Sequence, residues 1–277
     1  MTRDAFDGKV VFITGAASGI GRALAGALSK RGAVLLLADI EADMLERAAW
    51  ALGGEANDVH TFHLDVRKSS NWEHVAAEIY QRFDHVDYFF NNAGIAVAGL
   101  VRDTTLEDWE RLFAVNVLGV VRGVDAFYPR MRDQGHGHIV NTASIAGLVP
   151  TSLMAAYSAS KHAVVAFSET LRAEAKSDGL DVSVVCPGII DTPMAHTTEL
   201  RGAPDEPVLS KLPKPPFPVE EAVQQMLRGV ERKRGIIVIT RDANLLWRLY
   251  RTSPEAMLRM NVKTVRWLRR LTGTKTP

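Results

Sequence analysis

Short apolar runs alternate along the chain with longer segments in which apolar side chains recur every three to four residues. The short runs are typical of strands buried on both faces, and the longer segments are typical of amphipathic helices. Regular alternation of the two predicts parallel strands joined by helices. We therefore expect an α/β fold with a doubly wound parallel sheet of about seven strands.

The pattern places the strands and helices along most of the chain. Residues 194–218 depart from it, because six prolines there predict a long loop or lid. Residues 241–277 follow the last expected strand, so we divide the chain into a domain at 1–240 and a helical C-terminal extension at 241–277. The expected strands are residues 9–14, 33–39, 60–65, 86–91, 138–142, 181–186 and 235–240, and the main helices are residues 20–30, 41–52, 71–83, 106–132 and 156–177.

A glycine-rich turn joins the first strand to the first helix. In the sequence TGAASGIG, Gly15, Gly19 and Gly21 allow a sharp turn, a close approach to a pyrophosphate and tight packing of the helix. The helix N-terminus, with Ser18 and Ile20, offers free N–H groups to phosphate. An ordinary turn is the alternative, but the position between a buried strand and an amphipathic helix favours a nucleotide site in a Rossmann-type domain.

Asp39 ends the second strand, 24 residues after Gly15. A carboxylate there accepts hydrogen bonds from adenosine ribose hydroxyls and repels a 2′-phosphate. Ile40 follows it, where an Arg would favour NADP, and Arg22 is the one nearby cation. We predict NAD as the cofactor, with NADP as the less favoured alternative. A helix N-cap role for Asp39 is compatible with this prediction.

Tyr157 and Lys161 lie four residues apart at the start of a predicted helix, and so on one face of it. Ser144 follows the strand at 138–142, at the sheet edge where such folds bind ligands. An unperturbed Tyr pKa near 10 is about 4 kcal/mol too high for a base at neutral pH. An ammonium at about 4 Å offsets about that much. We predict Tyr157 as general acid/base, assisted by Lys161, with Ser144 binding the substrate oxygen; an ordinary surface pair is the alternative.

Together these motifs resemble the short-chain dehydrogenase/reductase family in its compact single-domain form. The resemblance covers residues 8 to about 240. It implies an NAD(P)-dependent oxidoreductase acting on CH–OH groups, and a homodimer or homotetramer assembled through the helices at 106–132 and 156–177. The matching motifs occur in the family's order: TGAASGIG at 14–21, Asp65, NNAG at 91–94, Asn116 in NVLG, Ser144, YSASK at 157–161, Pro187-Gly188 and Thr192.

The resemblance also implies individual roles. Asp65 and Val66 would hold the adenine, and Thr192 the nicotinamide carboxamide. Asn116 would support a proton relay through water. A nucleotide-sensing protein without turnover is the other class of function, and the complete catalytic set argues against it. Further implied cofactor contacts are Asn92, Ala93, Gly94, Tyr157, Lys161, Pro187, Gly188 and Ile190.

The side chains expected near the site are mostly apolar, with no Arg or Lys placed to hold a carboxylate or phosphate. We therefore expect a hydrophobic secondary alcohol or ketone, such as a lipid, retinoid or steroid. A polyol or sugar is the alternative, and several of these residues would also suit an ordinary core. They are Ile145, Leu148, Val149, Leu153, Met154, Ile189, Ile190 and Met194.

The composition adds a compartment and an uneven charge. The single Cys186 excludes an internal disulfide, and neither a signal peptide nor an apolar run of about 18 residues is found, so we expect a cytoplasmic protein. His136 and His138 lack a third ligand, and no metal is expected. The net charge of +1 sums −9 over residues 1–227 (20 basic, 29 acidic) and +10 from Arg228 onward (13 basic, 3 acidic). No nucleic-acid partner is expected.

Residues 254–271 are predicted to form a basic amphipathic helix, with Ser253 as N-cap and Pro254 at its first position. Such helices often lie in membrane interfaces. Docking of the apolar side on the domain or on a second subunit is the other interpretation, and both stay open. Apolar Met257, Leu258, Val262, Val265, Leu268 and Leu271 fall on one side with Trp267 at its edge, opposite Arg259, Lys263, Arg266 and Arg270.

Overall fold

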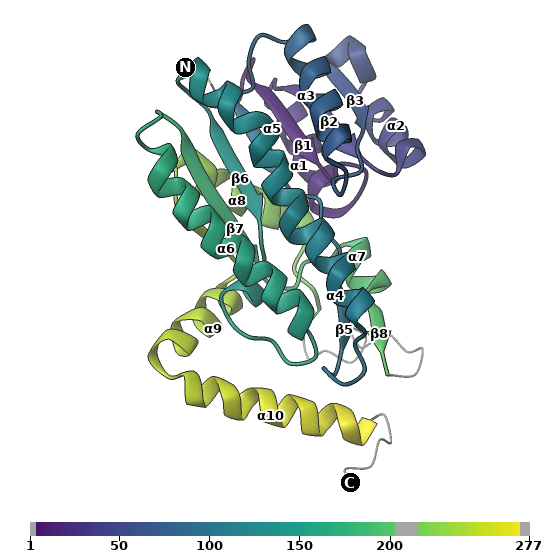
Figure 1. Cartoon of the computed structure of the whole chain (residues 1–277), viewed down its shortest axis with the longest axis vertical. Coiled ribbons are helices and arrows are strands. Elements are labelled where there is room, and N and C mark those ends of the chain that lie inside the picture. Colours follow the sequence, from purple (N-terminus) through teal and green to yellow (C-terminus); the bar gives the residue numbers. More distant parts are fainter. Residues whose placement is uncertain (1–3, 203–214, 272–277) are drawn as a thin grey trace.

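The computed structural model describes residues 4–202 and 215–271, and its centre is a seven-stranded parallel sheet (Figure 1). The order β3-β2-β1-β4-β6-β7-β9 confirms the doubly wound topology. It reverses direction between β1 and β4, which is where such sheets bind ligands. The strands are β1 Val10–Thr14, β2 Val34–Asp39, β3 Val59–His63, β4 Tyr88–Asn91, β6 His138–Thr142, β7 Asp181–Pro187 and β9 Ile236–Ile239.

Helices cover both faces of the sheet. The first face carries α1 (Gly19–Ser29), α2 (Ala42–Trp50) and α8 (Val219–Glu231). The second carries α3 (Ser69–Arg82), α5 (Gly119–Gln134) and α6 (Ala155–Ala175). Short 3-10 turns, η1 (Gly54–Asn57) and η3 (Ile145–Gly147), complete the connections.

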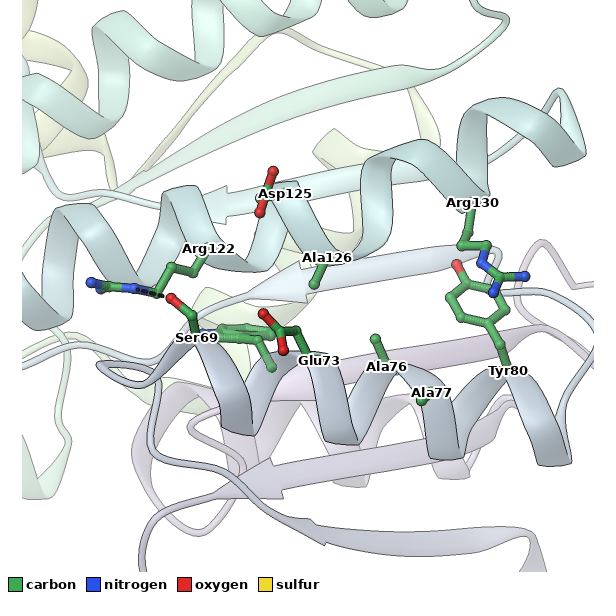
Figure 2. Close-up of a pocket in the computed structure, with 10 residues that line it drawn as sticks. Ser69, Glu73, Ala76, Ala77, Tyr80, Arg122, Asp125, Ala126 and Arg130 are labelled. Carbon is green, nitrogen blue, oxygen red and sulfur yellow. Dashed lines mark hydrogen bonds between the residues drawn. The ribbon is translucent and has the colours of Figure 1, made fainter.

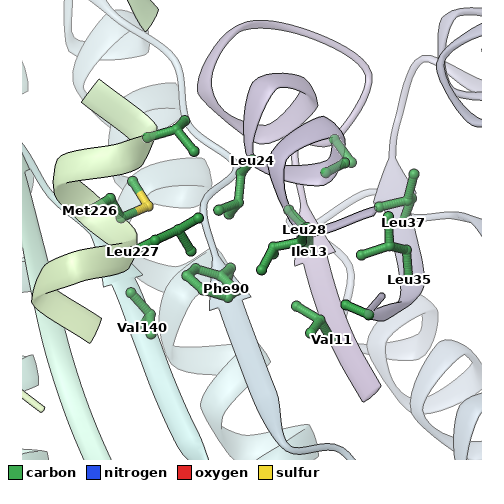
Figure 3. Packing of buried hydrophobic residues seen from close by; sticks show 14 of the residues in the cluster. Val11, Ile13, Leu24, Leu28, Leu35, Leu37, Phe90, Val140, Met226 and Leu227 are labelled. Carbon is green, nitrogen blue, oxygen red and sulfur yellow. The ribbon is translucent and has the colours of Figure 1, made fainter. Parts of the chain in front are cut away.

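Alternate residues of the strands fill two separate cores. Val11 and Ile13 of β1 lie under α1 and α8, where they meet Leu24 and Leu227 (Figure 3). The intervening Phe12 points to the other face and stacks on Phe89 and Phe127, with ring centroids 5.3 and 4.8 Å away. Because both faces are buried, the strands need the continuous apolar runs seen in the sequence.

The predicted helix at 106–132 is one continuous run with a change of winding. It comprises α4 (Leu106–Phe113), the π-helical turn η2 (Ala114–Leu118) and α5. Pro129 does not end it; the helix continues to Gln134, where Gly135 takes a φ of 72°. The run is long and apolar enough to cross a membrane by those two criteria alone. Since Leu112, Val120 and Phe127 are buried in the domain, we interpret it as a core helix.

The described part of the predicted loop at 194–218 has regular structure. It contains α7 (Pro193–Thr197) and β8 (Glu199–Arg201), which pairs with β5 (Val97–Gly99) in a second small sheet that the sequence pattern did not predict. The Arg201 guanidinium donates two hydrogen bonds, of 2.9 and 2.7 Å, to Asp108. Residues 203–214 lie outside the described part of the chain.

Two helices follow the last strand, α9 (Arg241–Thr252) and α10 (Pro254–Leu271). Met257 is buried beside Trp247 and Leu148, so part of α10 docks on the domain. Asn261 adds two hydrogen bonds, donating to Pro150 O over 2.9 Å and accepting from Ser152 Oγ over 3.2 Å. The predicted side-chain positions of Trp267, Leu268, Arg270 and Leu271 lie outside what the structure describes.

Candidate active site

The glycine-rich turn between β1 and α1 has the close packing that its sequence predicts. Gly15 and Gly19 adopt φ values of 68° and 52°, a region that favours glycine. A Cβ on Gly21 would lie 2.0 Å from the Gly15 carbonyl oxygen, so no side chain fits there. Ser18 is the N-cap of α1 and makes no side-chain cap bond. The turn therefore has the close-packed backbone and helix N-terminus that fit a pyrophosphate.

Thr14 joins this turn to the segment after β4. Its hydroxyl oxygen accepts from the N–H groups of Asn92 and Ala93 over 2.9 and 3.1 Å. The Asn92 amide returns a bond to Thr14 O over 3.1 Å. Thr14 is the first residue of the glycine-rich motif, but nothing in the sequence pattern indicates its contacts with the 92–93 segment. It brings the predicted cofactor residues of two motifs together.

Asp39 lies at the end of β2 and turns back toward the glycine-rich turn. Its Oδ2 accepts from the Ala17 N–H over 3.0 Å, and its Oδ1 from the Glu41 N–H over 3.1 Å. Glu41, not Asp39, is the N-cap of α2, so the N-cap interpretation was wrong. The carboxylate is placed next to the predicted phosphate site, which fits a nucleotide whose ribose is unmodified.

Asp65 and Val66 follow β3 on the same side. Asp65 is buried and accepts two 2.9 Å hydrogen bonds from the Arg67 guanidinium, which hold the pKa of its carboxyl below the usual range. Val66 O accepts from Trp72 Nε1 over 3.0 Å. Both residues are thus fixed near the end of the sheet, and their role toward adenine stays a prediction.

Tyr157 and Lys161 are both buried at the start of α6, so the surface-pair interpretation was wrong. Lys161 Nζ donates to Thr142 O over 3.0 Å and lies 5.7 Å from the Tyr157 ring centroid. Burial lowers the Lys161 pKa to about 8. Burial also raises the pKa of Tyr157, and a hydrogen bond with Ser144 acts in the opposite direction. Burial is the largest influence on the Tyr157 pKa. The sequence-based prediction considered only the effect of the Lys161 charge on this pKa.

Ser144 is buried just after β6, at the carboxyl edge of the sheet. Its Oγ accepts from the Ala146 N–H over 3.1 Å, which orients the hydroxyl beside Tyr157. Cys186 is fully buried nearby, and burial raises the pKa of its thiol to about 12. A thiol this protonated packs as a small apolar side chain and is a poor nucleophile.

Asn116 lies in the π-helical turn η2 and is fully buried. Its amide bonds both backbone groups of Ile95, at 2.9 and 3.0 Å, and donates to Ser160 Oγ over 3.1 Å. A Cβ on Gly94 would lie 3.2 Å from Asn116 Oδ1 and 3.3 Å from Lys161 Nζ. Gly94, Asn116 and Lys161 are therefore neighbours in space. π-helical turns often occur at functional sites. The residue pattern predicted a continuous helix here and did not indicate the π-helical turn.

The segment after β7 closes over the glycine-rich turn. The position of a Cβ on Gly19 is 3.4 Å from Thr192 Cβ, so Thr192 lies over the predicted phosphate site. A Cβ on Gly188 would be 2.8 Å from Thr240 Oγ1, which leaves that position to glycine. Pro187 is the last residue of β7. The Ile190 side chain belongs to the core, so only its backbone is available to a cofactor.

The residues predicted to face a substrate divide into three groups. Leu148, Val149 and Ile190 are packed in the hydrophobic core, which was the alternative to a substrate contact for these residues. Ile189 and Met194 are 50% and 38% exposed. The remaining three, all half-buried near Tyr157, are Ile145, Leu153 and Met154.

A cavity of about 300 Å³ lies elsewhere, on the outer side of α3 and α5 (Figure 2). Arg122 crosses one end and donates to Ser69 Oγ over 3.1 Å, while Arg130 lies over the Tyr80 ring at the other end. None of the predicted catalytic residues lines it. Among the described residues, no group of three or more His, Cys, Asp or Glu side chains is placed to hold a metal ion.

Comparisons with known proteins agree with this geometry. The family model described as short chain dehydrogenase matches residues 9–201. A crystal structure of a short chain dehydrogenase/reductase from Burkholderia phymatum in complex with NAD superposes with a TM-score of 0.82 at 30% identity, covering 92% of this chain and 96% of that one. The chain belongs to the short-chain dehydrogenase/reductase family.

Two curated relatives come from Mycobacterium tuberculosis, and both are named as oxidoreductases. SadH is 37% identical over 250 residues, which cover 86% of this chain and 88% of SadH. EphD is 32% identical over 265 residues, which cover 92% of this chain and 45% of EphD. The chain thus spans about half the length of the EphD relatives that it matches.

Proposed function

We propose that this protein is an NAD(P)-dependent oxidoreductase that interconverts a secondary alcohol and a ketone. The observation that carries the proposal is the burial of Tyr157 and Lys161 beside Ser144 and Asn116 at the carboxyl edge of the sheet. A protein that only senses a nucleotide needs no such set. Buried titratable groups gathered next to a nucleotide site are typical of catalytic centres.

In this proposal the protein's own residues bind the substrate oxygen and move its proton. Ser144 hydrogen-bonds the oxygen on which charge develops. Tyr157 takes the hydroxyl proton during oxidation and returns it during reduction. Lys161, with its pKa near 8, is cationic at neutral pH and stabilises the tyrosinate. Asn116 holds the turn through which a water relay would pass. A bound nicotinamide supplies the hydride transfer.

NAD is the cofactor we propose, with NADP less favoured. The residues that would hold it lie in the glycine-rich turn and just after the neighbouring strands, and close contacts among them support this role. Besides the glycine-rich turn they are Asp39, Asp65, Val66, residues 92–94, Pro187, Gly188 and Thr192. A 2′-phosphate would meet the Asp39 carboxylate at close range, which costs electrostatic energy.

We propose a hydrophobic substrate, such as a lipid, retinoid or steroid. Ile189 and Met194 are exposed next to the site, and Ile145 and Met154 are half-buried there, which favours apolar surface. A screen of purified protein with NAD and with NADP, followed through NADH or NADPH absorbance, tests both choices. Long-chain or polycyclic alcohols should react best. Faster oxidation of small polyols would contradict the substrate class, and no oxidation or reverse reduction of any compound would favour the nucleotide sensor.

A cytoplasmic homo-oligomer, dimeric or tetrameric, completes the proposal. Leu118 and Val121 are exposed on the 106–134 run, and this apolar surface supports contact with a second copy. Sedimentation velocity tests the assembly.

A further inference from the structure

Helices α9 and α10 present apolar and cationic side chains that the domain does not cover. Arg259, Lys263 and Arg266 are exposed, and none has an ion-pair partner in the described part of the chain. Cations beside exposed apolar side chains are typical of helices that lie in a membrane interface. The exposed apolar residues are Leu245 (68%), Leu258 (54%), Met260 and Val262.

The way α10 is attached decides which side it presents. Met257 is buried, and Asn261 bonds the segment at 150–152, so this side faces the domain. At 3.6 residues per turn, Leu258 and Val262 lie about 100–140° around the helix from Met257. The three cations lie about 180–240° around it. The uncovered sectors therefore adjoin, apolar beside cationic, and both face away from the domain.

The uneven distribution of charge determines which end of the molecule an anionic surface would attract. Residues 241–277, which include α9 and α10, hold 9 basic and 2 acidic residues, a balance of +7, and residues 1–240 hold 24 basic and 30 acidic residues, a balance of −6. Figure 1 shows α10 as a rod at one end of the molecule, far from the N-terminus. An anionic surface would attract this end and repel the acidic body. The protein would then bind with α10 facing the surface.

A second copy of the chain is the other candidate occupant, since its acidic body would also attract the cations. A two-fold dimer through this surface would, however, place the α10 cations of one copy against those of the other, and like charges repel. The segment that Asn261 holds leads through Met154 into the helix of Tyr157. A lipid bilayer satisfies the cations and also presents hydrophobic compounds to this end.

We propose that α9 and α10 dock the protein peripherally on anionic membranes, with the substrate side of the domain toward the bilayer. The docking itself is independent of catalysis. Delivery of the substrate from the bilayer rests on the proposed function.

Vesicle sedimentation with the full-length protein tests the docking without any substrate. The protein should pellet with phosphatidylcholine vesicles that contain phosphatidylglycerol and stay in solution with phosphatidylcholine alone. Raising NaCl to about 1 M, where the screening length falls to about 3 Å, should release it. No pelleting with the anionic vesicles at low salt would overturn the proposal.

Two variants locate the binding surface. Arg259→Glu with Lys263→Glu and Arg266→Glu should lower vesicle partitioning at least about 100-fold, since each cation near an anionic surface contributes about five- to tenfold. Leu258→Asp with Val262→Asp should also weaken it strongly. Circular dichroism and NAD binding confirm that each variant is folded.

The matched control changes the same charge elsewhere. Lys30→Glu, Arg47→Glu and Arg132→Glu alter exposed cations on other elements and should have a much smaller effect. An equal loss in both triple variants would overturn the α10 surface. A native protein that binds no vesicles, and whose sedimentation coefficient falls only when the three α10 cations are reversed, would use this surface to bind a second copy of the chain. Pelleting by a protein that oxidises no alcohol would leave the docking standing and contradict the proposed function alone.

Discussion

Asn116 donates a hydrogen bond to Ser160 Oγ over 3.1 Å, and Ser160 in turn donates to Tyr157 O over 2.8 Å. This chain of contacts joins the π-helical turn to the first turns of α6. Asn116 also satisfies the N–H and the carbonyl of Ile95. One buried amide therefore fixes the segment after β4 against the helix that carries Tyr157 and Lys161.

Removing that amide should affect both stability and turnover. Asn116→Ala would leave the N–H and the carbonyl of half-buried Ile95 unpaired, at up to about 1–3 kcal/mol each. We expect the free energy of unfolding to fall by about 2–4 kcal/mol, and kcat to fall sharply because the site loses its alignment. Ser160→Ala removes the two bonds of the Ser160 hydroxyl, to Asn116 and to Tyr157 O, and should cost about 1–2 kcal/mol. Urea unfolding and steady-state kinetics measure both, and an Asn116→Ala enzyme with unchanged kcat would contradict the role.

The first helix offers a matched pair of glycines. A Cβ on Gly21 would clash with Gly15 O at 2.0 Å, whereas one on Gly26 meets nothing within 4 Å. Gly21→Ala should therefore abolish NAD binding, because the phosphate turn must shift. Gly26→Ala should preserve binding and stabilise the helix by up to about 1 kcal/mol. Calorimetric titration measures the affinity of both variants for NAD. Equal affinity would refute the proposal that the glycine-rich turn binds the cofactor.

Cofactor preference should depend on Asp39. Replacing its carboxylate removes the repulsion toward a 2′-phosphate, and an adjacent cation adds attraction. Asp39→Ser with Ile40→Arg should raise kcat/KM with NADP and lower it with NAD, reversing their ratio. Asp39→Ser alone should weaken the NAD preference. A double variant that still prefers NAD as strongly as the native protein would show that these positions do not set the choice.

Acid should destabilise the fold through His138. This side chain is buried on β6, and burial lowers its pKa from 6.5 to about 4. The unfolded chain therefore binds the proton more tightly, and stability present above pH 6.5 is lost as the pH falls toward 4. We expect about 2 kcal/mol of loss from this group between about pH 7 and pH 5. His138→Gln should remove that part of the pH dependence in urea unfolding; an unchanged dependence would assign it to other groups.

Hydrophobic periodicity predicted all seven strands of the main sheet, because strands buried on both faces must be apolar throughout. The motifs also predicted that Gly15, Ser144, Tyr157 and Lys161 lie at the carboxyl edge of the sheet, because the carboxyl ends of parallel strands meet at one edge. The division of the chain at residue 240 and the individual site roles stay predictions.

The features that periodicity missed depend on long-range contacts. β5 and β8 are three residues each, too short for a periodic signal. The Arg201–Asp108 ion pair and the hold of Asn261 on Pro150 join residues about a hundred positions apart. Burial of Tyr157 changes its pKa in a direction that residue spacing alone did not indicate.

Tyr157→Phe provides the most direct test of the central claim, that Tyr157 transfers the substrate proton. The substitution removes one hydroxyl from a buried ring and leaves the glycine cradle untouched. We predict that turnover of the best alcohol from the screen is lost, while NAD binding, followed by calorimetric titration, stays within a few-fold of the native value. Substantial dehydrogenase activity in this variant, with NAD binding intact, would contradict the assignment.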